Sequence, residues 1–229
     1  MRTAIYIDGY NLYYGVIHGT NYKWLDMVSL FTSLTKKVRQ ETEVVKVGYF
    51  TARVKAMYSK HGQDSYTAQD RYIRSLEGLY PNIFSATLGT HIARVVPKIK
   101  AKKPLDVWDR VEVHNIEEKK TDVNIALDMY RDAISGNFDQ LVLVTSDSDL
   151  QPAVELIKAD CSGVEIGVVL PSHPPKNIAN EGKVRTGGSF KVHASWILNN
   201  IGEKDLRENQ LPKIVTPIKG KNIKKPSYW

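Results

Sequence analysis

Cysteine is almost absent from this sequence. Cys161 is the only one, so no disulfide can form within the chain, and we expect a reducing compartment, the cytoplasm. No run of about 18 apolar residues is present, so we expect no membrane-spanning helix. The first residues, MRTAIYIDGYN, lack the longer apolar stretch of a signal peptide, so we expect none.

Acidic residues are scarce in two stretches that are rich in lysine. Residues 94–103 (RVVPKIKAKK) contain no acid, and residues 207–229 contain six basic residues and one acid. The second stretch therefore carries +5 of the formal net charge of +7. Such stretches attract phosphate backbones, although each alone is equally compatible with a solvated loop or a solubilising tail. Residues 207–229 also combine several prolines with little apolar periodicity, so we expect a flexible tail after a domain of residues 1–206.

Short apolar runs alternate with segments of helical periodicity. The runs are apolar along their whole length, which is typical of strands that are buried on both faces of a parallel sheet. A hydrophobic content of 42% is sufficient for a sizeable core. We therefore predict an α/β fold, a Rossmann-like parallel sheet with helices on both faces. The predicted strands cover residues 3–7, 43–50, 83–88, 140–145 and 164–170, and the predicted helices cover residues 24–39, 64–79, 122–135 and 149–159.

The region after the third predicted strand has a different pattern. RVEVH, residues 110–114, alternates like an exposed strand, and residues 92–96 can pair with it. Residues 98–104 would then form the loop between them. We predict a β-hairpin arm that carries the first basic stretch.

The pattern becomes weaker beyond residue 170. Residues 173–189 (HPPKNIANEGKVRTGGS) are polar and rich in turn formers, which predicts a loop. We interpret residues 190–192 as a short edge strand and residues 194–201 as a final short helix.

Acidic side chains follow two of the predicted strands. Asp8 follows the first strand, and Asp147 and Asp149 follow the strand at residues 140–145. Asp122 lies at the start of a helix. Ligands bind at the carboxyl ends of parallel strands, so we expect these carboxylates to meet in one cleft. Converging carboxylates repel each other unless a cation lies between them, and oxygen ligands without a nearby Cys or His cluster favour Mg²⁺ or Mn²⁺.

Each of these acids also has a simpler interpretation. A single aspartate after a strand is usually a turn former or a helix cap. The segment SDSD, residues 146–149, could cap the helix that follows, and Asp149 could do so even if Asp147 binds a metal. Acids at the ends of two strands, in a fold whose cleft lies there, favour the metal site.

Three motifs resemble those of the NYN family, a branch of the PIN-like nuclease superfamily. They are IDGYN at residues 7–11, EEKKTDVNIALDM at residues 117–129 and VTSDSDLQPAV at residues 144–154. Their order and spacing also agree with the family, and the resemblance covers roughly residues 1–200. It implies a PIN-like α/β sandwich and, as in many members, a metal-dependent ribonuclease activity.

The resemblance also implies roles for individual residues. Asp8, Asp122 and Asp147 would bind the metal directly or through water, and Asp149 would be a fourth acid at the metal. Asn11 would orient the site. The implied catalytic residues are therefore Asp8, Asn11, Asp122, Asp147 and Asp149, with Mg²⁺ or Mn²⁺ as the cofactor.

RNA would need cationic and aromatic contacts beside the acids. Basic residues follow the second strand and continue on the next helix, so several could face the cleft. Tyr10, Tyr13 and Tyr14 follow Asp8 and could stack on bases, with partial burial at the core edge as the alternative. The predicted RNA-binding residues are Arg53, Lys55, Arg71, Arg74, Lys100, Lys102, Lys103 and Lys120.

Our leading hypothesis is a metal-dependent endoribonuclease. A nucleic-acid-binding module with little catalysis would keep the basic stretches but would not need the full set of acids. An enzyme that acts on a small molecule in the same cleft is a third reading, because a fold does not fix a function. We expect RNA as the partner, no membrane, and a chain that can form homo-oligomers.

Overall fold

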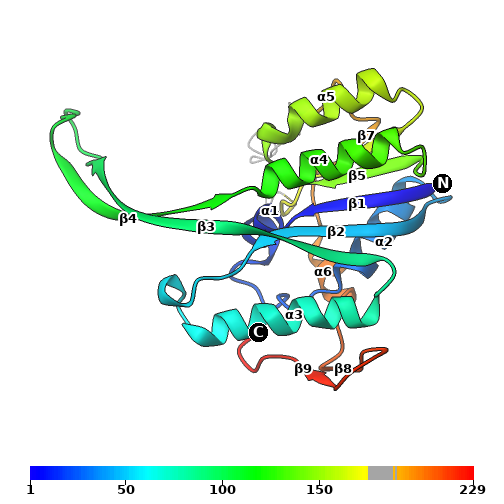
Figure 1. The fold of residues 1–229 in the computed structure, drawn as a ribbon, viewed down its shortest axis with the longest axis horizontal. Coiled ribbons are helices and arrows are strands. Elements are labelled where there is room, and N and C mark those ends of the chain that lie inside the picture. The colour runs from blue at the N-terminus through cyan, green and yellow to red at the C-terminus, as the bar shows by residue number, and fades with distance from the viewer. Residues whose placement is uncertain (175–187, 189) are drawn as a thin grey trace.

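A seven-stranded sheet forms the centre of the molecule (Figure 1). The computed structural model describes residues 1–174, 188 and 190–229. The strands lie in the order β4-β3-β2-β1-β5-β6-β7, and all neighbouring pairs are parallel except β3 and β4. Their bounds are β1 (Arg2–Asp8), β2 (Glu43–Ala52), β3 (Phe84–Ile99), β4 (Arg110–Lys119), β5 (Gln140–Val144), β6 (Glu165–Val169) and β7 (Trp196–Leu198).

Helices cover both faces of this sheet (Figure 1). Alternate residues of a strand point to opposite faces, so each strand contributes to two cores. Ile5 and Ile7 of β1 pack on the side of α2 and α3, whereas Ala4 and Tyr6 pack on the side of α4 and α5. The predicted α/β fold is therefore confirmed. The bounds are α2 (Met27–Val38), α3 (Gln63–Leu79) and α6 (Glu203–Glu208) on one face, and α4 (Thr121–Ile134) and α5 (Gln151–Asp160) on the other.

Four short helical turns join these elements. They are α1 (Gly9–Leu12), η1 (Tyr13–Ile17), η2 (Ala56–Tyr58) and η3 (Ser148–Leu150). In the part of the chain that the structure describes, no helix is both long enough and apolar enough to cross a membrane.

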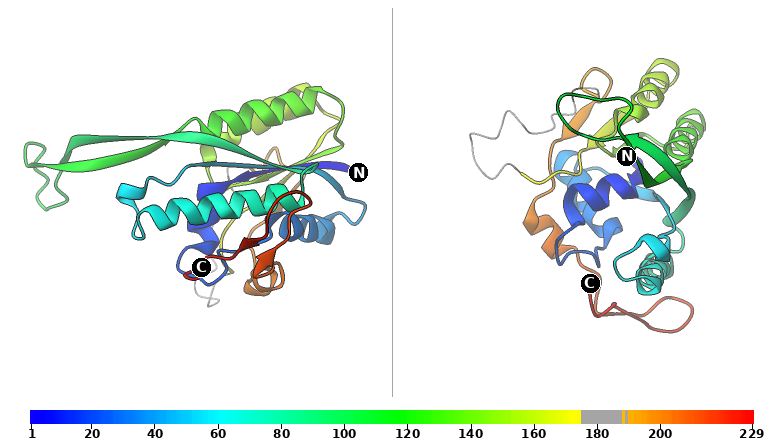
Figure 2. Two further views of the ribbon diagram at one scale, coloured as in Figure 1. Left: turned by 60° about the horizontal axis from the view of Figure 1, so that its bottom comes forward. Right: turned by 90° about the vertical axis from the view of Figure 1, so that its left-hand side faces the viewer.

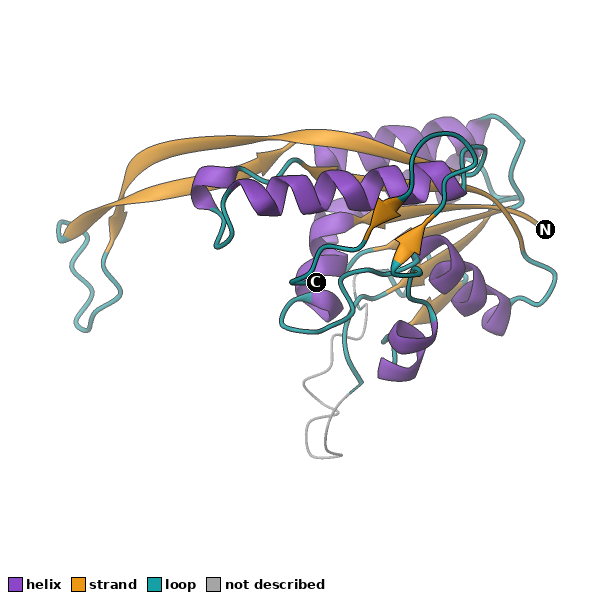
Figure 3. Ribbon diagram, turned by 90° about the horizontal axis from the view of Figure 1, so that it is seen from below, coloured by secondary structure: helices purple, strands orange, loops and turns teal. Residues whose placement is uncertain are grey.

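The outer part of β3 and the whole of β4 leave the sheet as a long antiparallel hairpin (Figures 1 and 3). The two strands pair from Thr90 with Lys119 to Ile99 with Arg110. The first part of β3 remains in the sheet, where it pairs with β2 up to Gly89. The predicted β-hairpin arm is confirmed, and it is longer than the pattern indicated.

The chain connections change direction between β1 and β5. From β1 the chain passes through α2 to β2, whereas from β5 it passes through α5 to β6 on the opposite side. Such a reversal leaves a crevice at the carboxyl ends of the two central strands, where α/β proteins bind ligands. Asp8 ends β1 and Thr145 follows β5, so the candidate acids lie at this edge of the sheet.

The far edge of the sheet differs from the prediction. Residues 190–193 form a turn, and the edge strand is β7, inside the segment predicted to be a helix. A Cβ atom on Gly167 would lie 2.1 Å from Cζ2 of Trp196, so the indole packs directly on this glycine of β6. The predictions of a strand at residues 190–192 and of a helix at residues 194–201 are therefore wrong. The strand β7 forms through its pairing with β6, and such a contact between distant segments leaves no periodic pattern in the local sequence. Residues 175–187 and 189 of the predicted loop lie outside the described residues.

The C-terminal segment packs against the domain (Figure 2). β8 (Ile214–Val215) pairs with β9 (Ile223–Lys224), and the side chains of Val215 and Ile223 are buried in the core. The indole N–H of Trp24 donates a hydrogen bond to the carbonyl of Pro212 at 2.8 Å. The segment expected to be a flexible tail is therefore a packed part of this structure, because its few apolar side chains fill gaps beside α2 and α3.

Candidate active site

The side chain of Asp8 lies between the ends of two neighbouring strands and is only 3% exposed. Its Oδ1 accepts hydrogen bonds from the backbone N–H groups of Tyr10 (3.1 Å) and Asn11 (3.0 Å), so Asp8 also caps α1. Its Oδ2 accepts from the side-chain amide of Asn11 (2.7 Å) and from the hydroxyl of Thr145 (2.9 Å). Burial raises the pKa of Asp8, although the bonds from Asn11 and Thr145 favour the carboxylate.

Asn11 joins the exits of the two strands. Its amide donates to Asp8, while its Oδ1 accepts from the backbone N–H of Ser146 at 3.1 Å. The loop that follows β5 is thereby held against the end of β1. This position fits the orienting role that the resemblance implies for Asn11.

Asp147 and Asp149 follow the same strand but differ in their surroundings. The backbone N–H of Asp147 donates to the Thr145 hydroxyl at 3.0 Å. Oδ1 of Asp147 accepts from the backbone N–H of Asp149 at 3.0 Å, so Asp147 caps η3. Asp149 is exposed. Asp147, and not Asp149, therefore makes the cap that the sequence offered as an alternative role for this segment.

Asp122 lies in the first turn of α4 and is half-buried. Burial is the main cause that raises its pKa, and the charges of Asp8, Asp147 and Asp149 raise it further. Asp122 therefore lies within electrostatic range of the other three carboxylates. That these acids bind one metal remains a prediction.

Glu118 is a fifth acid of this group, and the sequence reasoning missed it. Burial raises its pKa to about 7, and the charges of Asp8 and Asp122 add to this effect. It lies near the end of β4, where pairing with His91 brings the hairpin back to the crevice. The hydroxyl of Thr121 donates a hydrogen bond to Glu118 Oε1. The only available signal was its place in the EEKKTD motif, four residues before Asp122.

The chemistry of the five acids suits a hard divalent cation. All candidate ligands are carboxylate oxygens, and their mutual repulsion is the effect that a bound cation relieves. Within residues 1–174, 188 and 190–229, no three or more His, Cys, Asp or Glu side chains are arranged to hold a metal ion as they stand. The donor set therefore fits Mg²⁺ or Mn²⁺ in its chemistry, and binding would require some of these side chains to move.

The motifs and the geometry agree with a comparison to known families. The sequence profile of the NYN domain matches residues 2–184 of this chain. The chain belongs to the NYN domain family. Its nuclease-like α/β fold places the acids of all three motifs at the crevice between β1 and β5.

Two known proteins are similar to this NYN domain. The first is named 6-hydroxy-3-succinoylpyridine 3-monooxygenase HspA, from Pseudomonas putida. It is 33% identical over 247 aligned positions, which cover 100% of this chain and 76% of the relative. The second is a crystal structure of a protein of unknown function from Vibrio parahaemolyticus. Its TM-score is 0.48 at 18% identity, with 88% of this chain and 93% of that chain covered.

The predicted RNA-binding residues of the NYN domain lie in separate places. At the end of β2, Arg53 lies 3.2 Å from Asp70 and beneath the Tyr66 ring, and Arg74 also pairs with Asp70 at 3.4 Å. Lys55 lies on the same connection and lines a cavity. The others are Arg71, exposed on α3, Lys100, Lys102 and Lys103 at the tip of the arm, and Lys120, which precedes α4 with a φ of 81°.

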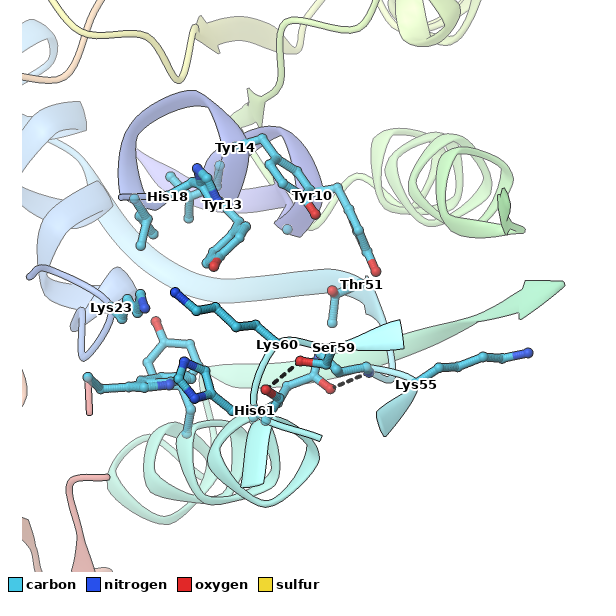
Figure 4. A pocket seen from close by; sticks show the side chains of 18 of the residues that line it. Tyr10, Tyr13, Tyr14, His18, Lys23, Thr51, Lys55, Ser59, Lys60 and His61 are labelled. Carbon is cyan, nitrogen blue, oxygen red and sulfur yellow. Dashed lines mark hydrogen bonds between the residues drawn. The ribbon is translucent and has the colours of Figure 1, made fainter. Parts of the chain in front are cut away.

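A cavity of about 930 Å³ opens beside the acids of the NYN domain (Figure 4). Its walls come from the segment that follows β1, from the connection between β2 and α3, and from the base of the hairpin arm. Aromatic side chains dominate these walls, and Glu118 belongs both to the cavity and to the group of acids. The lining residues include Tyr10, Tyr13, Tyr14, His18, Lys23, Lys55, Tyr58, Lys60, His61 and Tyr228.

His91 connects the cavity wall to the backbone of the connection after β2. Its Nδ1 lies 2.9 Å from the carbonyl of Arg53, and its Nε2 lies 2.6 Å from the hydroxyl of Tyr10. A carbonyl can only accept, so Nδ1 carries the proton and Nε2 accepts from Tyr10 when the ring is neutral. The ring of Tyr10, two residues after Asp8, is thereby fixed at the boundary between the acids and the cavity.

Replacement of Glu118 by glutamine should change how stability depends on pH. The pKa of Glu118 is about 7 in the folded chain and about 4.5 as its ordinary value, so the unfolded chain binds fewer protons between these limits. The free energy of unfolding of the wild type therefore falls as pH rises from 4.5 to 7. E118Q removes this loss and should melt a few degrees above the wild type beyond pH 7, at about 2–4 °C per kcal/mol.

Thermal melts in EDTA between pH 4.5 and 8 test this dependence. The two melting temperatures should converge toward the acidic end of the range. A difference that stays the same at every pH would show that Glu118 is not held away from its ordinary pKa.

Proposed function

We propose that this NYN domain is a metal-dependent ribonuclease that hydrolyses RNA phosphodiesters at the crevice between β1 and β5. The observation that supports this proposal most is the group of carboxylates around Asp8. Asp122 gains its raised pKa partly from Asp8, Asp147 and Asp149, so the group combines acids of all three motifs. Caps at the ends of neighbouring strands would account for Asp8 and Asp147, but not for Asp122 and Glu118, which reach the same group from α4 and β4.

Each residue of the proposed site has a separate task. Asp8, Asp122 and Asp147 would hold the metal, with Asp149 at its outer side. A divalent metal, when bound, lowers the pKa of a coordinated water and neutralises charge on the phosphate. Asn11 and Thr145 hold the Asp8 carboxylate in one orientation, so it needs no reorganisation when the substrate binds.

Cationic side chains would position the RNA strand. Lys120 directly precedes α4 and Lys55 lines the adjacent cavity, and these positions support a role for both in contacting phosphates near the cleaved bond. Lys100, Lys102 and Lys103 at the tip of the arm lie farther out and would add contacts that do not depend on sequence. Lys100 and Lys102 both pair with Asp109, which reduces the charge that they present.

The test is a cleavage assay of the purified protein on labelled single-stranded and structured RNA. We expect products with Mn²⁺ or Mg²⁺ and none with EDTA, because without a cation the carboxylates repel the phosphate and nothing neutralises its charge. Addition of Mn²⁺ should also raise the melting temperature, since a ligand that binds only the folded state stabilises it. Cleavage that persists in EDTA would contradict the proposal, and RNA binding without cleavage would favour a nucleic-acid-binding module.

A second candidate function is an enzyme that acts on a small heteroaromatic acid in the same cleft. Two observations favour it. The relative at 33% identity is named for a substrate with a pyridine ring and a succinoyl group. The cavity beside the acids has tyrosine walls and three lysines, Lys23, Lys55 and Lys60, which are suited to an aromatic anion. Calorimetric titration with a pyridine carboxylate tests this candidate, and an absence of binding at millimolar concentration would remove it.

A further inference from the structure

The cavity beside the acids is larger than an ordinary gap between packed side chains. Its volume is about 930 Å³, near the upper end of the roughly 300–1,000 Å³ that is typical of ligand sites. A wall that forms after β1 faces a wall formed by η2 and the start of α3 (Figure 4). In this view Lys60 reaches across the space between Tyr13 and His61.

The wall after β1 is a cluster of aromatic rings that are open to solvent on one side. The ring of Tyr14 lies 5.9 Å from that of Tyr10 and 5.1 Å from that of Tyr13. His18 completes the cluster at 5.6 Å from both Tyr13 and Tyr14. Tyr14 is 65% exposed, so a large part of its ring remains available to a planar ligand.

The backbone explains why these rings face the cavity. η1 is a short π-helical turn, a form that occurs often at functional sites. A Cβ atom on Gly15 would lie 1.9 Å from the carbonyl oxygen of Pro171, so only glycine lets this turn pack against the exit of β6. With Gly15 against Pro171, the neighbouring Tyr13 and Tyr14 line the cavity.

Three lysines give the cavity a positive charge. Lys23, Lys55 and Lys60 line it, and within the described ranges 1–174, 188 and 190–229 no carboxylate forms an ion pair with any of them. Glu118 and Tyr10 form the border toward Asp8. A ligand with a planar ring and flanking negative charges therefore fits this cavity, with its ring on the tyrosines and its negative charges beside the lysines.

We infer that this cavity receives an unpaired nucleobase of the RNA strand, adjacent to the phosphate that is cut. The inference rests on the proposed ribonuclease function. It predicts that the substrate is single-stranded RNA, or a loop or bulge of a structured RNA. Bases in a duplex have both faces stacked on neighbours, so their rings cannot reach Tyr14 unless the base leaves the stack. Stacking of bases on aromatic side chains is tolerant of sequence, so little preference among the four bases is expected.

Binding measurements in EDTA separate this site from catalysis. The probes are a short labelled single-stranded RNA, the same sequence in a duplex, adenosine 5′-monophosphate, and ribose 5-phosphate as the ligand that lacks a base. We expect Y14A to weaken binding of the single strand and of the nucleotide about tenfold, with little change for ribose 5-phosphate. Y14F keeps the ring and should bind like the wild type. Because Tyr14 is largely exposed, both variants should keep the wild-type melting temperature.

Each alternative outcome contradicts one statement. Equal binding of single strand and duplex, or equal binding by Y14A and Y14F, would overturn the base site even if the protein cuts RNA. Tighter binding of a pyridine carboxylate than of the nucleotide would assign the cavity to a small molecule instead. Tyr14-dependent nucleotide binding without any cleavage in Mn²⁺ or Mg²⁺ would keep the base site and remove the proposed ribonuclease function.

Discussion

Replacement of Asp122 by asparagine is expected to abolish metal-dependent RNA cleavage while the metal-free protein stays at least as stable as the wild type. Asp122 is half-buried, and the charges of Asp8, Asp147 and Asp149 raise its pKa further. Removal of its charge should relieve repulsion in the absence of metal. The lost ligand costs several kcal/mol of transition-state stabilisation, roughly 100- to 1,000-fold in rate.

The variant D8N should lose cleavage as well, but with a loss of stability. Asp8 accepts hydrogen bonds from Tyr10, Asn11 and Thr145, and the amide group of an asparagine would meet one of these donors with a second donor. A buried polar group left without its partner costs about 1–3 kcal/mol. A lower melting temperature for D8N than for D122N would therefore show that hydrogen bonds hold the Asp8 carboxylate in the fold, whereas Asp122 contributes mainly its charge.

A matched control lies on the same helix as Asp122. Asp128 pairs with Lys46 at 2.7 Å and is remote from the crevice in its contacts, so D128N should keep cleavage. Cleavage, the melting temperature in EDTA and the shift caused by Mn²⁺ should be measured for all three variants. Full activity of D122N would remove Asp122 from the site, and a large loss of its metal-free stability would mark it as a structural residue.

The sequence was sufficient to predict the sheet and its most important edge. The strands β1, β5 and β6 are buried on both faces, so their residues must be apolar throughout, and this leaves a clear pattern. Asp8 and Asp147 interrupt that pattern where the strands end. In a fold with parallel strands, interruptions at the ends of neighbouring strands lie near each other, so the sequence alone predicts that these aspartates form one group.

Other features depended on contacts between distant segments. Glu118 reaches the acids through the pairing of β4 with β3, and β7 forms by pairing with β6, where Trp196 packs on Gly167. The cavity needs the segment after β1, the start of α3 and Tyr228 to meet. None of these contacts has a local periodicity, so the sequence predicted neither the fifth acid nor the cavity, although it singled out Tyr10, Tyr13 and Tyr14 as side chains that could stack on bases.

The packing of the C-terminal segment was also not predictable from the sequence. We expect that removal of this segment strongly lowers the stability of the domain. Leu211, Val215 and Ile223 are 4%, 0% and 7% exposed, although lysines surround them in the sequence. Burial of such a side chain contributes about 1.5–3 kcal/mol, and the total stability of a domain is only about 5–15 kcal/mol. A chain that ends at residue 210 should therefore be largely unfolded or insoluble, which circular dichroism and thermal melts will show.

The positive charge of this segment can be tested without removing its apolar side chains. Lys219, Lys221 and Lys224 are exposed, so their joint replacement by glutamine should leave the melting temperature unchanged. If they contact RNA phosphates, the slope of log affinity against log salt should become less steep, by up to about 0.7 per lost contact with single-stranded RNA. An unchanged slope would show that the segment serves the fold alone. Wild-type stability of the chain that ends at residue 210 would instead show that the segment contributes no stability.

Since Trp229 packs on Trp24 and lines the cavity, the truncation should also weaken nucleotide binding in any molecules that stay folded.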